Sequence, residues 1–212
     1  MSWYLENVYE RNEESPYTFY VPSQIIVDNL TVGDLVKLIF VIEAEQEDGL
    51  SAERMWVEIT QINGQKFIGK LDNEPYRIQD LKVGDEISFG IENICDTEYE
   101  DPNSSNWDYY FDTKVIVSDD VLEKREFNFL LRDHSHGEGD SGWSILSGFE
   151  DDDFLSDSEN FRVLSLGVIL NIDDSILEFI EEPPLCAYER SKEGEGIFIK
   201  IEDYDWDNYL NG

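Results

Sequence analysis

One short segment holds most of the side chains that could do chemistry in this chain. His134 and His136 alternate beside Asp133, and a turn-like stretch follows them. On an extended segment alternate side chains share a face, so the imidazoles and nearby carboxylates could hold a zinc ion. A structural zinc site usually takes four ligands, and no thiolate lies near. We therefore interpret the segment as a polar loop and keep the two histidines as weak metal candidates.

The same segment matches the letters of two enzyme motifs. Gly137–Gly142 reads as a dinucleotide-binding loop, but Glu138 and Asp140 would repel phosphate, and a strand-like run follows where a helix should begin. The letters GDSG, ending at Gly142, match the nucleophile stretch of trypsin-like proteases, which need a distant upstream histidine. Both histidines lie within seven residues of Ser141. Neither motif predicts an enzyme.

Carboxylates gather just beyond this segment, in Glu150–Asp153. An EF-hand loop beginning at Asp151 would need an oxygen ligand at its fifth position and glycine at its sixth. Leu155 and Ser156 occupy those places. The run therefore predicts a solvated acidic loop, with weak binding of a divalent cation as the alternative. No pattern in the chain calls for a cofactor.

Negative charge is the strongest overall property of the chain. Its 212 residues hold 15 Lys and Arg against 49 Asp and Glu, so the formal net charge is 15 − 49 = −34. Residues 1–112 hold 24 acids and 7 bases and residues 113–212 hold 25 and 8, which gives −17 for each part. Nucleic acids and anionic membranes both attract basic surfaces, so neither is expected as a partner. The 5 Trp, 11 Tyr and 12 Phe exclude a disordered acidic tail.

Cysteine usage and hydropathy point to a cytoplasmic protein. Cys95 and Cys186 form neither a CxxC pair nor a disulfide framework, which is typical of thiols in a reducing compartment. No basic segment followed by an apolar one opens the sequence. The longest apolar run, Leu38–Ile42, is far shorter than the ~20 residues of a membrane span.

Short strands separated by turns are predicted in the first half. A stretch beginning at Leu30 (LTVGDLVKL) is echoed 51 residues later by LKVGDEISF, and each copy places a Gly-Asp turn before a strand. We interpret the echo as two similar strand entries in a small, strongly bent sheet. The predicted strands are Val36–Ile42, Met55–Thr60, Lys66–Leu71 and Glu86–Ile91.

The second half mixes strands and short helices without a βαβ rhythm, which favours an α+β fold. Helices are predicted after Ser118, over Leu164–Leu170 and over Asp174–Ile180. The predicted strands are Lys114–Val117, Phe127–Arg132, Trp143–Ser147, Cys186–Tyr188 and Gly196–Ile201.

A breaker cluster at Asp101–Asn106 marks the expected division of the chain. We predict an N-terminal extension over 1–21, a β-rich domain over 22–97, a linker over 98–112 and an α+β domain over 113–212. The expected fold class is therefore α+β with a strongly bent, β-rich N-terminal domain.

Several short motifs follow one another along the second half of the chain. They are Arg132 at a strand end, Asp140-Ser141-Gly142-Trp143, Gly148-x-Glu150-Asp151, Ile169-Leu170-Asn171-x-Asp173 and Tyr188-Glu189-Arg190. Their order and spacing, from about Val115 to Ile201, resemble the thirty-third immunity-protein family of bacterial polymorphic toxin systems. The resemblance implies protection of the producing cell by binding of a toxin, and it brings no catalytic residues.

The first half resembles a second, uncharacterised bacterial family over about 22–97. The residues that carry this resemblance are Leu30–Phe40, the ERMWV stretch Glu53–Val57, Phe67–Pro75 and Gly84–Phe89.

These observations favour a non-enzymatic interaction protein whose protein partner is a basic toxin. Acidic surfaces steer basic partners toward them. We interpret Trp143 as a core tryptophan, and the alternative is an aromatic anchor at a recognition surface, where tryptophan is enriched. A structural or housekeeping module and a metal-assisted hydrolase using the two histidines are the competing hypotheses. The expected contact residues are Arg132, Asp140, Ser141, Gly142, Trp143, Glu150, Asp151 and Arg190.

Overall fold

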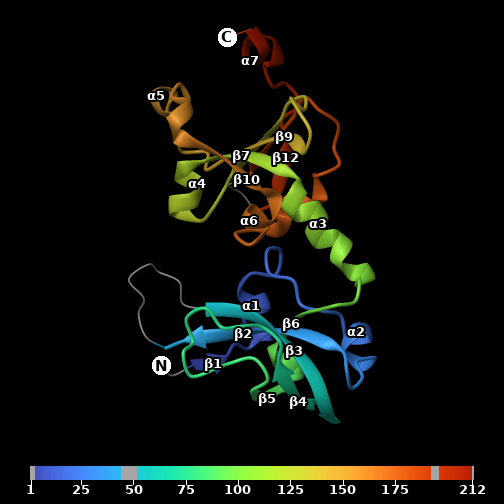
Figure 1. The fold of residues 1–212 in the computed structure, drawn as a ribbon. Coiled ribbons are helices and arrows are strands. Elements are labelled where there is room, and N and C mark those ends of the chain that lie inside the picture. Colours follow the sequence, from blue (N-terminus) through green and yellow to red (C-terminus); the bar gives the residue numbers. More distant parts are fainter. Residues whose placement is uncertain (1–2, 44–51, 192–195, 212) are drawn as a thin grey trace. The chain divides into compact units, whose positions relative to one another are not determined.

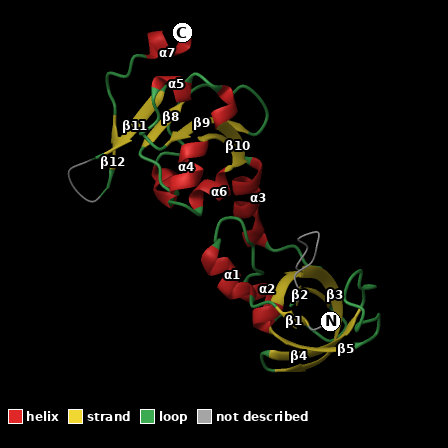
Figure 2. Cartoon of the chain, turned by 90° about the vertical axis from the view of Figure 1, so that its left-hand side faces the viewer, coloured by secondary structure: helices red, strands yellow, loops and turns green. Residues whose placement is uncertain are grey.

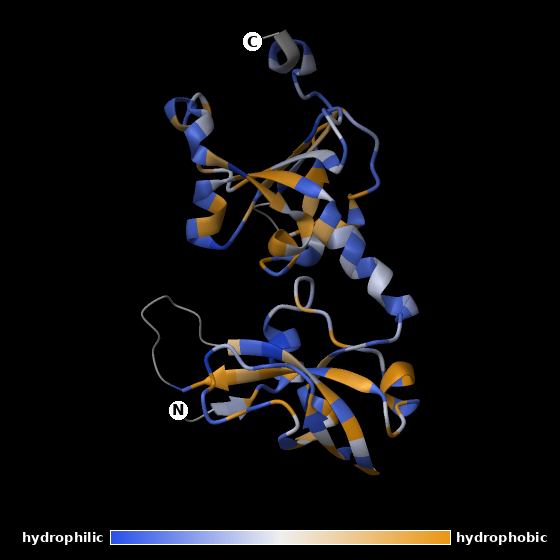
Figure 3. Cartoon of the chain, viewed as in Figure 1, coloured by the Kyte–Doolittle hydropathy of each residue, from blue (hydrophilic) through white to orange (hydrophobic). Residues whose placement is uncertain are grey.

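The chain divides into two compact units. The computed structural model describes residues 3–43, 52–191 and 196–211, and the units are Met1–Asn106 and Trp107–Gly212 (Figure 1). Apolar residues concentrate on the strands of both units, as Figure 3 shows. Within the described ranges, the chain has no helix with the length and apolar character needed to cross a bilayer.

The first unit is an antiparallel sheet that curls into a nearly closed barrel (Figure 2). The strand order is β1–β2–β3–β4–β5, and β6 pairs with the beginning of β2. Gly69 lets two strands approach closely, since a Cβ there would lie 2.4 Å from Val57 Cγ1. The four predicted strands are confirmed. The strands are β1 (Trp3–Leu5), β2 (Leu35–Ile42), β3 (Ala52–Asn63), β4 (Lys66–Leu71), β5 (Glu86–Gly90) and β6 (Ile94–Thr97).

The two Gly-Asp turns of this unit are built alike. Gly33 has φ +102° and Gly84 has φ +87°, conformations that favour glycine. In each turn the aspartate Oδ2 accepts a hydrogen bond from the backbone N–H three residues earlier, at 2.7 Å for Asp34 and 3.0 Å for Asp85. The sequence echo therefore reflects two equivalent strand entries.

Two helices accompany the barrel, α1 (Val8–Glu14) and α2 (Gln24–Asp28). The segment 1–21, for which no element was predicted, supplies strand β1, which pairs with β2, and helix α1. Val8 is fully buried and packs with Phe19 and Ile39 in a small cluster of its own.

The second unit is a mixed sheet of six strands in the order β10–β7–β9–β8–β11–β12. Strands β7 and β9 are parallel and every other pair is antiparallel. The expected α+β class is confirmed. The strands are β7 (Lys114–Ser118), β8 (Phe129–Arg132), β9 (Asp140–Leu146), β10 (Phe161–Ser165), β11 (Cys186–Arg190) and β12 (Phe198–Lys200).

Helices lie on both sides of this sheet. Figures 1 and 2 both place α4 and α6 on one side and α5 and α7 on the other. Ser118 caps α4 as predicted, because its Oγ accepts a hydrogen bond from Val121 N–H at 3.3 Å. The bounds are α3 (Ser105–Asp112), α4 (Asp119–Lys124), α5 (Asp152–Leu155), α6 (Leu166–Leu170) and α7 (Trp206–Asn211).

Three local predictions differ from the structure. The helix predicted over Leu164–Leu170 begins two residues late, because Leu164 and Ser165 end strand β10 and pair with β7, and only Leu166–Leu170 is helical. The helix predicted from Asp174 is a 3-10 turn over Asp174–Glu178, capped by Asp173. Helix α3 was not anticipated and occupies part of the segment 98–112.

Candidate interaction surface

Arg132 ends strand β8 and ties three backbone segments together. Its Nε donates to the carbonyl oxygen of Ser141 at 3.1 Å, and its Nη1 donates to the carbonyl oxygens of Ile180, at 2.8 Å, and of Glu182. A guanidinium offers five donors in a fixed geometry, which suits it to bridging carbonyl groups in this way. Arg132 therefore acts as a structural clamp, and its donors point into the fold.

Trp143 is fully buried, which confirms its interpretation as a core tryptophan and contradicts the alternative of an exposed aromatic anchor. Alternation along β9 turns Trp143 and Ile145 toward the helix-covered face of the sheet, where both have 0% exposure. The indole Nε1 donates to the carbonyl oxygen of Ile180 at 3.3 Å.

The three residues before Trp143 form the first part of strand β9. Asp140 Oδ1 accepts a hydrogen bond from Gly142 N–H at 2.9 Å, and its Oδ2 accepts from His136 N–H at 2.7 Å. Ser141 Oγ donates to the carbonyl oxygen of Lys114 at 2.6 Å. Gly142 has φ +76°, a conformation that favours glycine. Local backbone contacts account for all three side-chain types.

Glu150 is held by donors from a second part of the fold. Its carboxylate accepts hydrogen bonds from Ser118 Oγ, from Ser147 N–H at 2.7 Å and from Gly148 N–H at 2.8 Å. Burial raises the pKa of Glu150, but these hydrogen bonds outweigh that effect and hold the pKa below its usual range. The neighbouring Asp151 caps helix α5.

The lowered pKa of Glu150 predicts acid sensitivity of the second unit. Its contribution to the free energy of unfolding is complete above the unfolded-state pKa of about 4.3 and is lost as pH falls through the lower folded-state pKa. We expect Glu150→Gln to destabilise the protein at pH 7 and to flatten the decline in stability below about pH 4.3. Urea unfolding at several pH values checks this. Glu123→Gln, at an exposed position of α4, should leave the profile unchanged, and parallel profiles for wild type and Glu150→Gln would contradict the assignment.

Arg190 belongs to a third cluster. Its Nη2 pairs with Asp173 Oδ2 at 2.6 Å, its Nη1 donates to the carbonyl oxygen of Gly196 at 2.7 Å, and its Nε donates to that of Phe127 at 3.2 Å. The guanidinium also lies 4.3 Å from the ring centre of Phe198. The residues expected to contact a partner thus fall into separate clusters that hold loops and strand ends, and they do not converge on one site.

The two histidines receive no metal partners. His136 Nε2 lies 3.8 Å from Asp133 Oδ2, and both histidines are exposed. Across the described ranges, no group of three or more His, Cys, Asp or Glu side chains is arranged to hold a metal ion.

The face of the second unit's sheet opposite α4 and α6, called the open face below, carries a groove that sequence reasoning missed. Alternate residues of β7, β8 and β9 form its floor, and the segments around α5 and α7 form its two walls. The groove has a volume of about 550 Å³. Floor residues include Ile116, Phe129, Leu131, Ser144 and Leu146, and wall residues include Leu155, Phe161, Tyr204 and Tyr209.

Apolar side chains reach solvent on this face. Ile116 on the floor is 39% exposed, and Leu155 and Tyr209 on the two walls are 42% and 40% exposed. One sequence signal for the groove floor is the run Lys114–Val117. It is apolar at consecutive positions and so predicts a strand with apolar side chains on both faces. The walls lie far apart in the sequence and gave no comparable signal.

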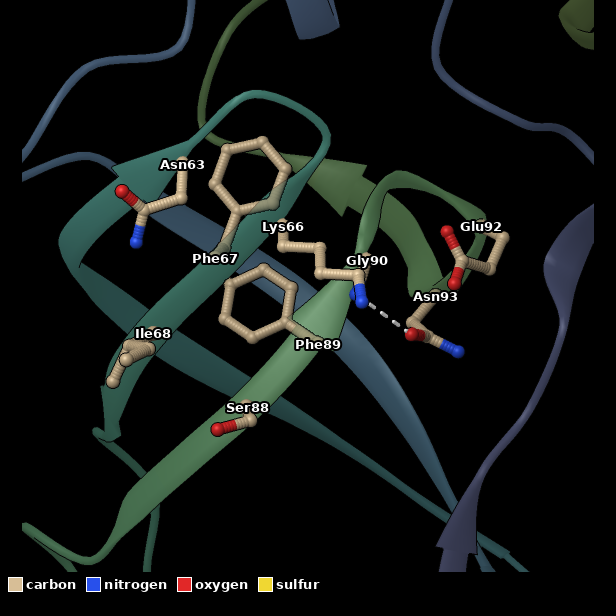
Figure 4. A pocket seen from close by; sticks show the side chains of 9 residues that line it. All are labelled: Asn63, Lys66, Phe67, Ile68, Ser88, Phe89, Gly90, Glu92 and Asn93. Atoms are coloured by element: carbon tan, nitrogen blue, oxygen red, sulfur yellow. Dashed lines mark hydrogen bonds between the residues drawn. The ribbon is translucent and has the colours of Figure 1, made fainter.

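The first unit has a hollow of its own, of about 460 Å³, at strands β4 and β5 (Figure 4). Phe67 and Phe89 stack there with ring centres 5.3 Å apart. Lys66 and Glu92 also line the hollow, and Asn93 Oδ1 accepts a hydrogen bond from Gly90 N–H at 2.9 Å. An apolar floor with one cation and one carboxylate can bind a ligand.

Two family models match the chain. Residues 115–202 match the Immunity protein Imm33 domain, and residues 15–119 match a family described as an uncharacterized protein conserved in bacteria (DUF2314). These matches confirm the two resemblances found in the sequence. No curated protein and no solved structure matches the chain.

Proposed function

We propose that this chain is a non-enzymatic immunity protein that binds and neutralises a bacterial protein toxin in the cytoplasm of the cell that makes it. The observation that carries the proposal is the match of residues 115–202 to the immunity-protein domain. That match supports a role in immunity and a protein partner. The groove on the same unit supports a role in binding rather than in catalysis.

The environments of the reactive side chains favour a non-enzymatic role. Burial raises the pKa of the Cys95 thiol to about 11, and it raises the pKa of Cys186 as well. Both cysteines are free and buried, so at neutral pH they are thiols rather than nucleophilic thiolates. The Ser141 hydroxyl donates a hydrogen bond to a backbone carbonyl oxygen, and such an oxygen is not a base that could activate the serine as a nucleophile.

The charge of the chain favours a basic toxin. With a net charge of −34, the protein attracts a cationic partner over distances of about a Debye length, about 8 Å at physiological salt. Such steering raises association rates by about 10–10³ and weakens as salt rises.

Co-expression tests this proposal. The product of the gene that adjoins this chain's own gene is expressed alone and together with the full chain, and colony survival is counted. We expect the product alone to stop growth and the chain to restore growth. We also expect the two proteins to co-purify. Their association rate should fall as the salt concentration rises. A harmless neighbouring product, or a toxic one that the chain neither binds nor neutralises, would favour the housekeeping hypothesis.

A further inference from the structure

The groove on the second unit's sheet favours a ligand with apolar side chains. Its floor and walls are formed mainly by aliphatic and aromatic side chains, with Ile116 and Leu155 reaching solvent. Burying such surface is worth about 25 cal/mol per Å². A volume of about 550 Å³ lies within the ~300–1,000 Å³ that binding pockets commonly have.

The segments that form both walls of the groove are rich in acidic residues. Residues 150–161, which include the first wall, contain six acids and no base, and residues 201–211, which include the second, contain four acids and no base. Asp152, Asp153 and Asp203 are exposed. The charge of Asp133 also adds to the effect of burial in raising the pKa of Tyr209 on the second wall. An apolar floor between acidic walls therefore complements a segment that is apolar on one side and basic along its edges.

We propose that this groove docks a basic amphipathic segment of the toxin, with apolar side chains on the sheet and Lys or Arg side chains against the two walls. This inference rests on the proposed function and adds the surface and the chemistry of the partner. A second copy of the chain is disfavoured as the occupant, because it would bring a unit of charge −17 against another of the same charge.

The probe is an amphipathic peptide of leucine and lysine, and its binding to the full chain is measured by titration calorimetry. Two comparison peptides separate the contributions: an oligolysine of equal charge, and a leucine–glutamate peptide with the same apolar side. We expect the leucine–lysine peptide to bind at least about tenfold more tightly than either, which is 1.4 kcal/mol or more. Equal affinity for the leucine–lysine peptide and oligolysine would overturn the proposal.

Two variants locate the binding. Ile116→Arg places a cation on the floor, and neutralising Asp152, Asp153, Glu159 and Asp203 to their amides removes exposed wall charges. Each is expected to weaken the binding of the leucine–lysine peptide about tenfold. The matched controls lie in the first unit: Ile25→Arg, at a position 70% exposed, and neutralisation of Glu13, Glu14, Glu74 and Glu86, which are also exposed. Equal losses in the variants and their controls would show non-specific attraction and refute the groove.

The same variants in the growth assay distinguish this inference from the proposed function. If the wild type protects cells and the groove variants protect equally well, the immunity role stands and the groove is not its docking surface. If the wild type does not protect, the immunity role fails, and the peptide measurements still decide whether the groove binds basic amphipathic segments. Sedimentation of the free chain as a dimer that Ile116→Arg dissociates would instead assign the groove to a second copy.

Discussion

Trp143→Ala is expected to destabilise the second unit by about 3–5 kcal/mol, the usual loss when a fully buried tryptophan is truncated. The indole has no exposed surface, and its truncation would leave a cavity beneath β9 and remove the hydrogen bond to the carbonyl oxygen of Ile180. Urea unfolding followed by circular dichroism measures the effect. Phe149→Ala, at a residue 64% exposed, is the control and should change stability by less than about 0.5 kcal/mol.

Trp143→Phe separates a core role from a contact role. It retains most of the buried area, so the folded protein should bind its partner with unchanged affinity. A stable Trp143→Ala protein that had lost binding would contradict the buried position of this side chain.

Gly142→Ala should destabilise the same unit by about 2–5 kcal/mol. Its φ of +76° costs about 1–2 kcal/mol for a residue with a side chain, and overpacking adds about 1–3 kcal/mol. A Cβ at this position would lie 2.1 Å from the carbonyl oxygen of Asp133, which is backbone and cannot easily move. The loss is read from the same urea transition.

Gly137→Ala is the matched control in the same loop, because a Cβ there would meet no atom within 4 Å. It should change stability by less than about 1 kcal/mol. Similar stability of the Gly142→Ala and Gly137→Ala proteins would show that the turn does not depend on glycine at position 142.

The parts of the fold that follow from local patterns could be predicted. The Gly-Asp turns and the β-branched runs of the first unit determine strand starts by local chemistry, and each appears where expected. The error at Leu164–Leu170 has a non-local cause: the pairing of Leu164 with Val115 makes the first part a strand, and the partner strand lies about 50 residues away. Short apolar runs do not reveal such a partner.

The candidate site was harder to predict because the motif residues combine features of both surface and core. Arg132, Glu150 and Arg190 are charged, and charged residues are normally exposed. Here hydrogen bonds to backbone groups hold them within the fold. The same motifs that carry the resemblance to the immunity-protein family therefore build the framework, and the groove depends on walls brought together only by folding.

Hydrogen exchange of the chain with and without the proposed toxin partner tests the central claim that the motifs fold the second unit while its open sheet face binds. Segments 152–161 and 203–209, which flank the groove, should gain protection when the toxin binds, and the loop 133–140 should exchange as in the free protein. Protection centred on 133–140 and on Glu150, with the groove walls unchanged, would contradict the account.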